Sequence, residues 1–380
     1  MGQLLEVDRN RNVRFNDDDH LSAAISWLQR AQDATSDGGM SGRFRLADGW
    51  TSSYPETTGY IIPTWLKLAS VQNDCAFVDR AERCVRFLLS SQLGSGAFPG
   101  GEVAENCTIP SPFNTAQIIH GLLAWHLHAG DQRALDAALR AADWLVSVQD
   151  EDGAFRKYSY KGVTASYTAH ATCWLAELGV HTGRKRYLST ATRHLDWILK
   201  YFVAGNSWFE FCGFDEEEHY DRRATTHTIA YTIFGVLYMS QLLGRTDGIE
   251  AARSAARAAL RCAESEGRVP GAMDASWRSA ADYTCLTGNA QLASIWFRLF
   301  GIDDDLRYVS AANSALEEVK RAQIMHVKDS GLHGGIAGSA PIWGNYLHFA
   351  LPNWAVKFFI DALLMKKQVI PCLKLRQGAA

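Results

Sequence analysis

Hydrogen-bonding side chains recur along this chain at a nearly constant interval. The recurring position holds Tyr60, Gln117, His170, Tyr231, Gln291 and finally Ala355, at intervals of 53 to 64 residues. Three or four residues earlier stand Glu56 and Thr57, Asn114, Tyr167, His227 and Thr228, and Thr287, whereas the last segment has Leu351 and Pro352. Residues three and four apart share one face of a helix. We therefore expect five of six repeated helices to contribute to one ring of polar groups.

This mixture of side chains suits proton transfer next to a carboxylate or carbonyl group. An amide side chain hydrogen-bonds the acid group of the substrate, and a histidine or tyrosine removes or returns a proton. The acid–base candidates are Tyr60, His170, His227 and Tyr231, with Glu56 placed to orient Tyr60 or His227. The candidate substrate ligands are Trp50, Tyr54, Asn114, Gln117, Tyr167, Arg222, Asn289, Gln291 and Trp343. The pattern favours epimerisation or β-elimination of an acidic sugar.

Hydrolysis of a glycoside is the main alternative, and it depends on carboxyl groups. An inverting glycosidase uses two of them, about 6.5–9.5 Å apart. Glu56 and Asp282 form the best pair, since each lies near the start of a repeated apolar helix, and Asp152 is a spare. A non-catalytic carbohydrate-binding toroid could use the same aromatic and amide side chains, but it would need no acid–base groups.

The elements that must position these residues are repeated helices. Segments 23–44, 81–101 and 140–158 each combine an aromatic residue, a glutamine and a glycine turn that closes on phenylalanine. Weaker copies follow at 193–211, 255–274 and 314–336. After each turn comes a more apolar helix, within 54–69, 113–130, 166–183, 226–244, 282–301 and 346–364. Apolar residues at helical spacing predict amphipathic outer helices around mostly buried inner ones.

Six such pairs predict an all-α fold, a closed (α/α)6 toroid, because closing the ring buries faces that a short open array would expose. We expect an N-terminal extension at 1–15, one toroid domain at 16–366 and a C-terminal tail at 367–380. The N-termini of the inner helices would then point toward the polar ring. Their dipoles would favour an anionic substrate, a tyrosinate and a neutral imidazole.

The glutamine and glycine–aromatic turns resemble the QW-type repeats of terpene cyclase and prenyltransferase toroids. The six-fold toroid is also similar to those of unsaturated glucuronyl hydrolases, N-acylglucosamine epimerases, uronate lyases and glucuronyl C5-epimerases. The likeness covers nearly the whole chain but is architectural, and a fold alone does not define a function. The acidic runs 16–20 and 301–306 look like caps of outer helices, which disfavours a terpene cyclase. A zinc enzyme would have to use Asp282, Cys285 and His348.

Composition excludes several other classes of protein function. The chain has 380 residues and a formal net charge of −3, which provides no basic surface for nucleic acid. No glycine-rich phosphate loop follows a strand, so we expect no nucleotide cofactor. Cys285 on an apolar helix is more often a packed thiol than a metal ligand, so we expect no bound metal. The eight cysteines are scattered without CxxC pairs, there is no apolar run of about 18 residues, and the N-terminus has no signal-peptide pattern. We therefore expect a cytoplasmic enzyme without a membrane span, whose oligomeric state the sequence leaves open.

Overall fold

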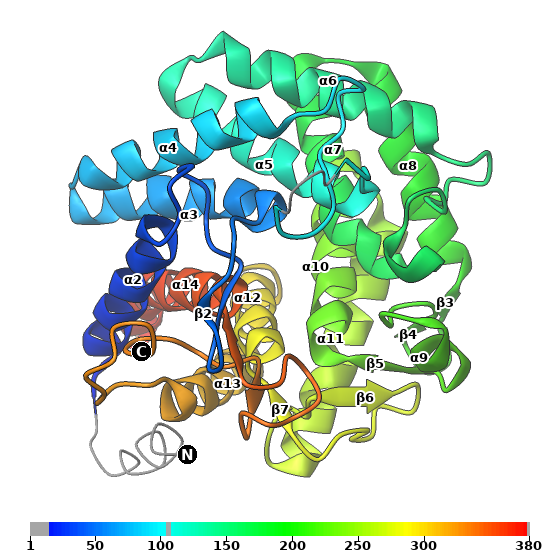
Figure 1. Ribbon diagram of the computed structural model, residues 1–380. Coiled ribbons are helices and arrows are strands. Elements are labelled where there is room, and N and C mark those ends of the chain that lie inside the picture. Colours follow the sequence, from blue (N-terminus) through cyan, green and yellow to red (C-terminus); the bar gives the residue numbers. More distant parts are fainter. Residues whose placement is uncertain (1–14, 104–107, 378–380) are drawn as a thin grey trace.

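The computed structural model describes residues 15–103 and 108–377, and within them twelve long helices form two concentric rings (Figure 1). The inner ring consists of α3 (Pro55–Gln72), α5 (Pro112–Ala129), α7 (Ala169–Thr182), α10 (Thr226–Leu243), α12 (Leu286–Asp303) and α14 (Asn353–Gln377). The outer ring consists of α2 (Asp17–Asp33), α4 (Ala76–Ser91), α6 (Gln132–Val148), α8 (Lys185–Lys200), α11 (Thr246–Glu266) and α13 (Leu306–Ala322). The prediction of six outer and six inner helices is confirmed.

The inner ring is closed. Each inner helix packs against the next, and α14 packs against α3. Glycines allow the closest approaches. A Cβ atom at Gly121 would lie 2.0 Å from the carbonyl oxygen of Gly59 on the neighbouring α3, and one at Gly235 would lie 2.2 Å from the backbone of Ala169. The small residues in the inner helices therefore bring neighbouring backbones together and make the ring narrow.

The glutamines of the turn motif join successive outer helices. The Nε2 atom of Gln92 donates to the carbonyl oxygens of Gly96 in its own turn, at 2.8 Å, and of Ala137 on α6, at 2.9 Å. Gln32 and Gln149 make the equivalent pair of bonds to α4 and α8. In the last repeat Gln323 donates to the carbonyl oxygen of His20 on α2, at 3.1 Å. The repeated motif thus closes the outer ring as well.

Short antiparallel strands precede several inner helices and fix where they begin. One sheet has the order β2-β1-β9 and pairs Phe44 with both Trp50 and Leu351. The strands are β1 (Arg43–Arg45), β2 (Gly49–Trp50), β3 (Phe202–Val203), β4 (Trp208–Phe209), β5 (Arg223–Thr225), β6 (Ala272–Asp274), β7 (Thr284–Cys285), β8 (Ser339–Ala340) and β9 (Ala350–Pro352). Strands β5, β7 and β9 lead directly into α10, α12 and α14. These long connections all lie at the N-terminal end of the inner ring. The short helix α9 (Glu216–Tyr220) precedes β5 in the connection from α8 to α10, and η1 (Tyr160–Gly162) and η2 (Ser166–Thr168) lie in the connection from α6 to α7.

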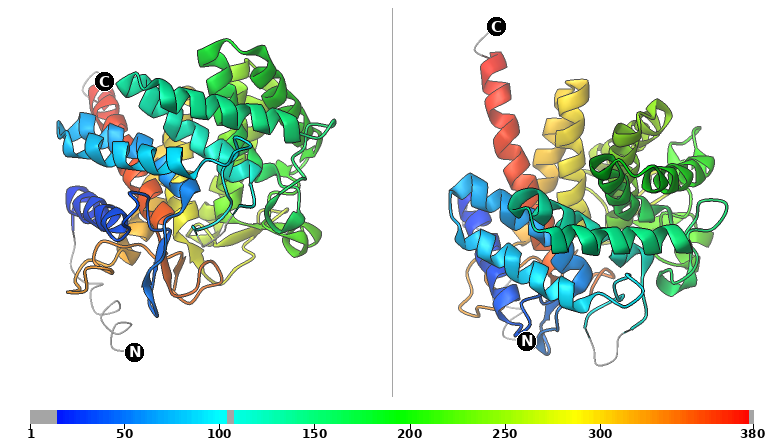
Figure 2. Two further views of the ribbon diagram at one scale, coloured as in Figure 1. Left: turned by 45° about the horizontal axis from the view of Figure 1, so that its top comes forward. Right: turned by 90° about the horizontal axis from the view of Figure 1, so that it is seen from above.

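The C-terminal boundary differs from the prediction. Helix α14 does not end near Lys366 but continues to Gln377 and extends past the neighbouring helices (Figure 2). Lys366 and Lys367 form ion pairs with Asp17 and Asp18 at the start of α2, and these pairs hold this part of the helix. Most of the predicted N-terminal extension, residues 1–14, lies outside the described residues. Among the described helices, none is long and apolar enough to cross a membrane.

Candidate active site

Five recurring polar residues and one phenylalanine meet in one layer across the inner ring. We call this the polar layer: Tyr60, Gln117, His170, Tyr231, Gln291 and Phe358. Each of them is buried. The sixth member is Phe358, so the prediction of Ala355 was wrong by one helical turn. The ring centroid of Phe358 lies 5.8 Å from that of Tyr60 and 5.9 Å from that of Tyr231.

The predicted alignment of α14 was wrong because of Lys357. In the other five inner helices the residue before the polar layer is small: Gly59, Ala116, Ala169, Ala230 and Ala290. Lys357 takes that place in α14 and is only 6% exposed. Its ammonium lies 2.8 Å from the Asp361 carboxylate and 4.2 Å from the centroid of the Phe358 ring. The Asp361 carboxylate also accepts a hydrogen bond from Thr64 of α3, at 2.9 Å, so this buried cation belongs to the joint that closes the ring.

Glu56 lies one turn above the polar layer, at the start of α3. Its carboxyl group is buried and accepts a hydrogen bond of 2.7 Å from the Tyr54 hydroxyl. With its amide turned to satisfy its neighbours, Asn114 donates to the same carboxyl oxygen at 3.3 Å. Burial raises the pKa of Glu56 to about 7, although the Tyr54 hydrogen bond opposes the rise. Near neutral pH this carboxyl group can both give and take a proton.

The tyrosines of the site are held in the protonated form. Burial raises the pKa of Tyr60 and of Tyr231 well above the ordinary value, and the nearby Glu56 carboxylate adds to both shifts. The expectation that helix dipoles would favour a tyrosinate was therefore wrong, because desolvation outweighs them. Tyr60 and Tyr231 can donate hydrogen bonds, but they are poor bases.

The two histidines flank Tyr231. The ring centroids of His170 and His227 lie 4.0 Å and 4.2 Å from that of Tyr231. Burial lowers the pKa of His227 to about 4 and that of His170 well below its ordinary value, so both imidazoles are neutral, as expected from the sequence. Each Nδ1 atom faces an amide, at 2.6 Å from Gln117 Nε2 for His170 and at 2.8 Å from Gln291 Oε1 for His227.

Aromatic residues surround Glu56 and His227 at the N-terminal end of the ring. We call them the aromatic rim: Tyr54, Phe113, Tyr167, Phe214, Tyr346 and Trp354. The indole of Trp354 donates to the Tyr346 hydroxyl at 2.9 Å, and the rings of Phe214 and Tyr346 are stacked with centroids 6.2 Å apart. Flat apolar faces next to hydrogen-bonding groups are typical of carbohydrate sites.

The rim also has a cation that sequence reasoning missed. The Arg43 guanidinium lies 5.8 Å from the centroid of the Trp354 ring and 2.7 Å from the Glu102 carboxylate. Phe113, Phe214 and Trp354 were missed too. Trp354 is the second residue of α14, as Glu56 is of α3, so a correct register would have revealed it.

Several predicted site residues lie elsewhere. Trp50 packs against Trp27 and Phe44, with ring centroids 4.9 Å and 5.2 Å away. Arg222 is exposed and pairs with Glu210, and Trp343 is 62% exposed. Asn289 is buried, and its amide donates to the carbonyl oxygen of Cys285 at 2.9 Å. In the described part of the chain, no side-chain hydrogen bond, ion pair or ring contact joins these residues to the polar layer.

The predicted pairing of Glu56 with Asp282 is not present. Asp282 is solvent-exposed before β7, whereas Glu56 is buried. The spare carboxylate, Asp152, pairs with Arg156 at 2.6 Å on the surface. His348 is exposed and Cys285 is fully buried at the start of α12. Among the described residues no three His, Cys, Asp or Glu side chains are placed to hold a metal ion.

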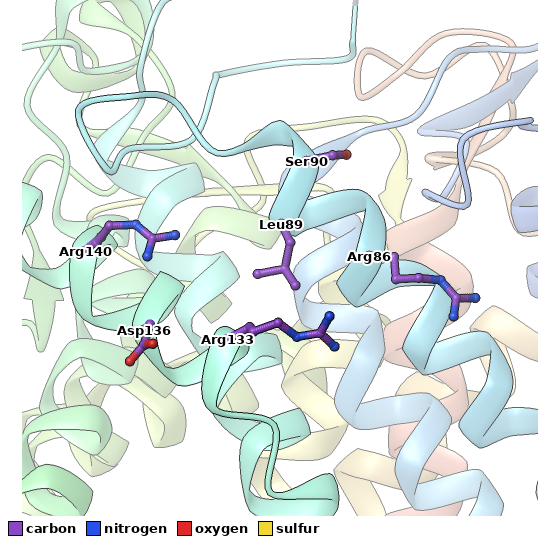
Figure 3. A pocket seen from close by; sticks show the side chains of 6 residues that line it. All are labelled: Arg86, Leu89, Ser90, Arg133, Asp136 and Arg140. Atoms are coloured by element: carbon purple, nitrogen blue, oxygen red, sulfur yellow. The ribbon is translucent and has the colours of Figure 1, made fainter.

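A groove of about 570 Å³ on the outer surface does not belong to this site (Figure 3). It lies between α4 and α6 and is lined by Arg86, Leu89, Ser90, Arg133, Asp136 and Arg140. Its arginines already have partners, since Arg86 pairs with Glu82 and Arg133 pairs with Asp131. The chemistry-bearing residues are those of the inner ring.

Comparisons with known proteins agree with a site for carbohydrate. Residues 18–322 match the model of the β-L-arabinofuranosidase GH127 catalytic domain. No curated protein is similar enough in sequence to count as a match.

Solved structures of sugar enzymes share the fold. An unsaturated glucuronyl hydrolase specific for heparin has a TM-score of 0.73 and 14% identity, with 94% of this chain and 99% of that chain covered. A cellobiose 2-epimerase from Bacillus thermoamylovorans has a TM-score of 0.70 and 12% identity, with 90% and 97% covered. A sugar epimerase from a ruminal bacterium has a TM-score of 0.73 and 11% identity, with 92% and 97% covered. At these identities the likeness establishes the toroid alone.

Proposed function

The chain belongs to the β-L-arabinofuranosidase GH127 catalytic-domain family, and on that premise we propose that it is a glycoside hydrolase with Glu56 as its general acid. One observation carries the assignment to Glu56. It is a buried carboxyl group among aromatic and amide side chains, and its pKa is about 7. A general acid with a raised pKa is what a glycosidase needs to protonate the leaving oxygen.

The neighbours of Glu56 give the site its other properties. The amide of Asn114 and the hydroxyl of Tyr54 orient the carboxyl group, and the rings of Tyr346 and Trp354 offer faces to a sugar. A β-L-arabinofuranoside is the first substrate to test, because the family is named for it. Arg43 and Lys357 lie near the site, but the carboxylates of Glu102 and Asp361 already neutralise them, so a neutral sugar suits the site as well as an acidic one.

The test compares two leaving groups in wild type and Glu56→Gln. We expect the variant to lose about 10²–10⁴-fold in kcat/KM on an alkyl β-L-arabinofuranoside, which needs protonation of the leaving oxygen. The loss on the p-nitrophenyl glycoside should be much smaller, because p-nitrophenolate leaves without a proton. Equal losses on both substrates, or full activity of the variant, would contradict the role of Glu56. If neither glycoside reacts, acidic oligosaccharides are the next panel.

Epimerisation is the second candidate, and one observation favours it. Two neutral imidazoles, those of His170 and His227, lie on either side of Tyr231, an arrangement that suits removal and return of a proton. Incubation with sugars in deuterated water, followed by proton NMR, separates the two reactions. Epimerisation exchanges a carbon-bound proton for deuterium without cleavage, whereas hydrolysis cleaves the glycosidic bond and leaves carbon-bound protons in place.

A further inference from the structure

The orientation of the Gln117 side chain is determined by Trp174. The indole Nε1 of Trp174 donates to Gln117 Oε1 at 3.0 Å, and Gln117 Nε2 lies 2.6 Å from His170 Nδ1. An indole N–H can only donate, so the amide oxygen must face it and the amide NH2 must face the histidine. Gln117 is fully buried, so water cannot supply alternative partners. His170 Nδ1 is therefore the acceptor of this hydrogen bond.

An accepting Nδ1 determines where the proton of His170 lies. A neutral imidazole has one N–H, so with Nδ1 unprotonated the hydrogen is on Nε2. The ring stays neutral because its burial and the nearby Lys357 ammonium both disfavour a positive charge on it. His170 thus presents an N–H donor to the site.

His227 has the opposite arrangement. The amide oxygen of Gln291 lies 2.8 Å from His227 Nδ1, and a carbonyl oxygen can only accept. Unlike Gln117, this amide has no second contact, because its buried Nε2 atom has no hydrogen-bond partner among the described residues. In this orientation Nδ1 of His227 carries the hydrogen, and its Nε2 keeps a lone pair. In the described part of the chain neither Nε2 atom has a hydrogen-bond partner, so both are available to a substrate or to water.

We infer that Gln117 and Gln291 hold the two histidines in opposite tautomers, His170 as a donor and His227 as an acceptor at Nε2. This inference rests on the proposed function for its role in catalysis. In hydrolysis, His227 Nε2 would take a proton from water as the water oxygen bonds to the anomeric carbon. The bond from that carbon to the leaving oxygen breaks, and the leaving oxygen takes the Glu56 proton. The proton on His227 then returns to Glu56 through solvent.

His170, Gln117 and Trp174 have supporting roles in this scheme. The Nε2–H of His170 donates a hydrogen bond to a sugar oxygen on the other side of Tyr231. Gln117 and Trp174 do not touch the reacting atoms, so they are positioning residues that set the tautomer. The sequence placed Gln117 among the substrate ligands, but its two polar atoms are already engaged with Trp174 and His170.

Nitrogen-15 NMR of protein labelled at histidine tests the inference, because protonated and unprotonated ring nitrogens have well-separated shifts. We expect hydrogen on Nε2 in His170 and on Nδ1 in His227, with the signals assigned from His170→Gln and His227→Gln. The opposite state of either ring in wild type would overturn the inference. The spectrum needs no substrate. Failure to hydrolyse any sugar would therefore overturn only the proposed function and would leave the assignment of the two tautomers standing.

Two matched variants sharpen the test. In Gln117→Glu a carboxylate replaces the NH2 that faces His170, so the hydrogen of His170 should move to Nδ1. In Gln291→Glu the group facing His227 is still an acceptor, so its tautomer should not change. With its tautomer reversed, His170 Nε2 can no longer donate to the sugar, so Gln117→Glu should lose more kcat/KM than Gln291→Glu. An unchanged His170 spectrum in a folded Gln117→Glu, recorded at a pH high enough to ionise the new carboxyl group, would contradict the proposal. If that variant does not fold, the wild-type spectrum decides.

Discussion

Burial decides the chemistry of individual residues in this site. It raises the pKa of Glu56 to about 7 and lowers that of His227 to about 4, so at neutral pH the site combines a partly protonated carboxyl group with an uncharged imidazole. The same burial keeps Tyr60 and Tyr231 protonated. Residue types alone predict an acid–base site here, but the direction in which each group transfers a proton depends on what covers it.

The raised pKa of Glu56 makes stability depend on pH. The folded protein binds the proton more tightly than the unfolded chain, so this group's contribution is present below about pH 4.5 and is lost as the pH rises to about 7. We expect wild type to lose about 3 kcal/mol of unfolding free energy across this window, and Glu56→Gln to lose much less of it. Urea unfolding at pH 5 and pH 8 measures the difference. The same pH dependence in both proteins would place the pKa of Glu56 near its ordinary value.

At the scale of the helix, small residues set the distance between neighbouring inner helices. The long connections before the inner helices place the site at the N-terminal end of the ring. Gly59 and Gly121 let α3 and α5 approach until a Cβ atom would overlap a carbonyl oxygen. Strands β5, β7 and β9 then lead the chain into three of the inner helices, so the loops that supply Phe214 and Tyr346 lie at the N-terminal end of the ring. The aromatic rim is thus a product of the connections as much as of the helices.

Two glycine substitutions test the spacing. Gly121→Ala would place its Cβ 2.0 Å from the Gly59 carbonyl oxygen, so we expect it to destabilise the fold by about 1–3 kcal/mol or more. Gly301→Ala in α12 is the matched control, because a Cβ there meets no atom within 4 Å. Alanine favours a helix by about 0.5–1 kcal/mol over glycine, so the control should gain stability. Urea unfolding at one pH compares them. A Gly121→Ala protein as stable as wild type would mean that the two helices have room to separate.

At the scale of the whole molecule, closure joins the first and last repeats. Helix α14 packs on α3 through the Lys357–Asp361–Thr64 contacts, and Gln323 binds α2 as Gln92 binds α6. In a closed ring no repeat is terminal, so every apolar face is covered by a neighbour. Lys357 occupies its place in the inner ring because it takes part in this contact between α14 and α3.

Because the ring is closed, we expect Gln323, in the last repeat, to contribute as much to the stability of the fold as Gln92 does in an internal repeat. Gln323→Ala removes two donated hydrogen bonds, to the carbonyl oxygens of His20 and Gly334, and the 2.6 Å contact of Gln323 Oε1 with His20 Nδ1. We expect it to lower the unfolding free energy by about 1–3 kcal/mol, as should Gln92→Ala, with a single cooperative transition in both. Chemical denaturation followed by circular dichroism measures this. No effect of Gln323→Ala beside a clear effect of Gln92→Ala would indicate that the ring is held together elsewhere.

The sequence by itself determined the toroid and most of the polar layer. Helical periodicity is a local property, and a small residue before each polar one was enough to align five of the six inner helices. Only the tertiary structure decided the rest. Lys357 broke the pattern in α14, so Phe358 and Trp354 were found only when the ring was closed. Asp282, close to α12 in sequence, lies in solvent, because a connection is free to turn away from the helix that it precedes. Burial, which sets the protonation of Glu56, His170 and His227, depends on all six helices at once.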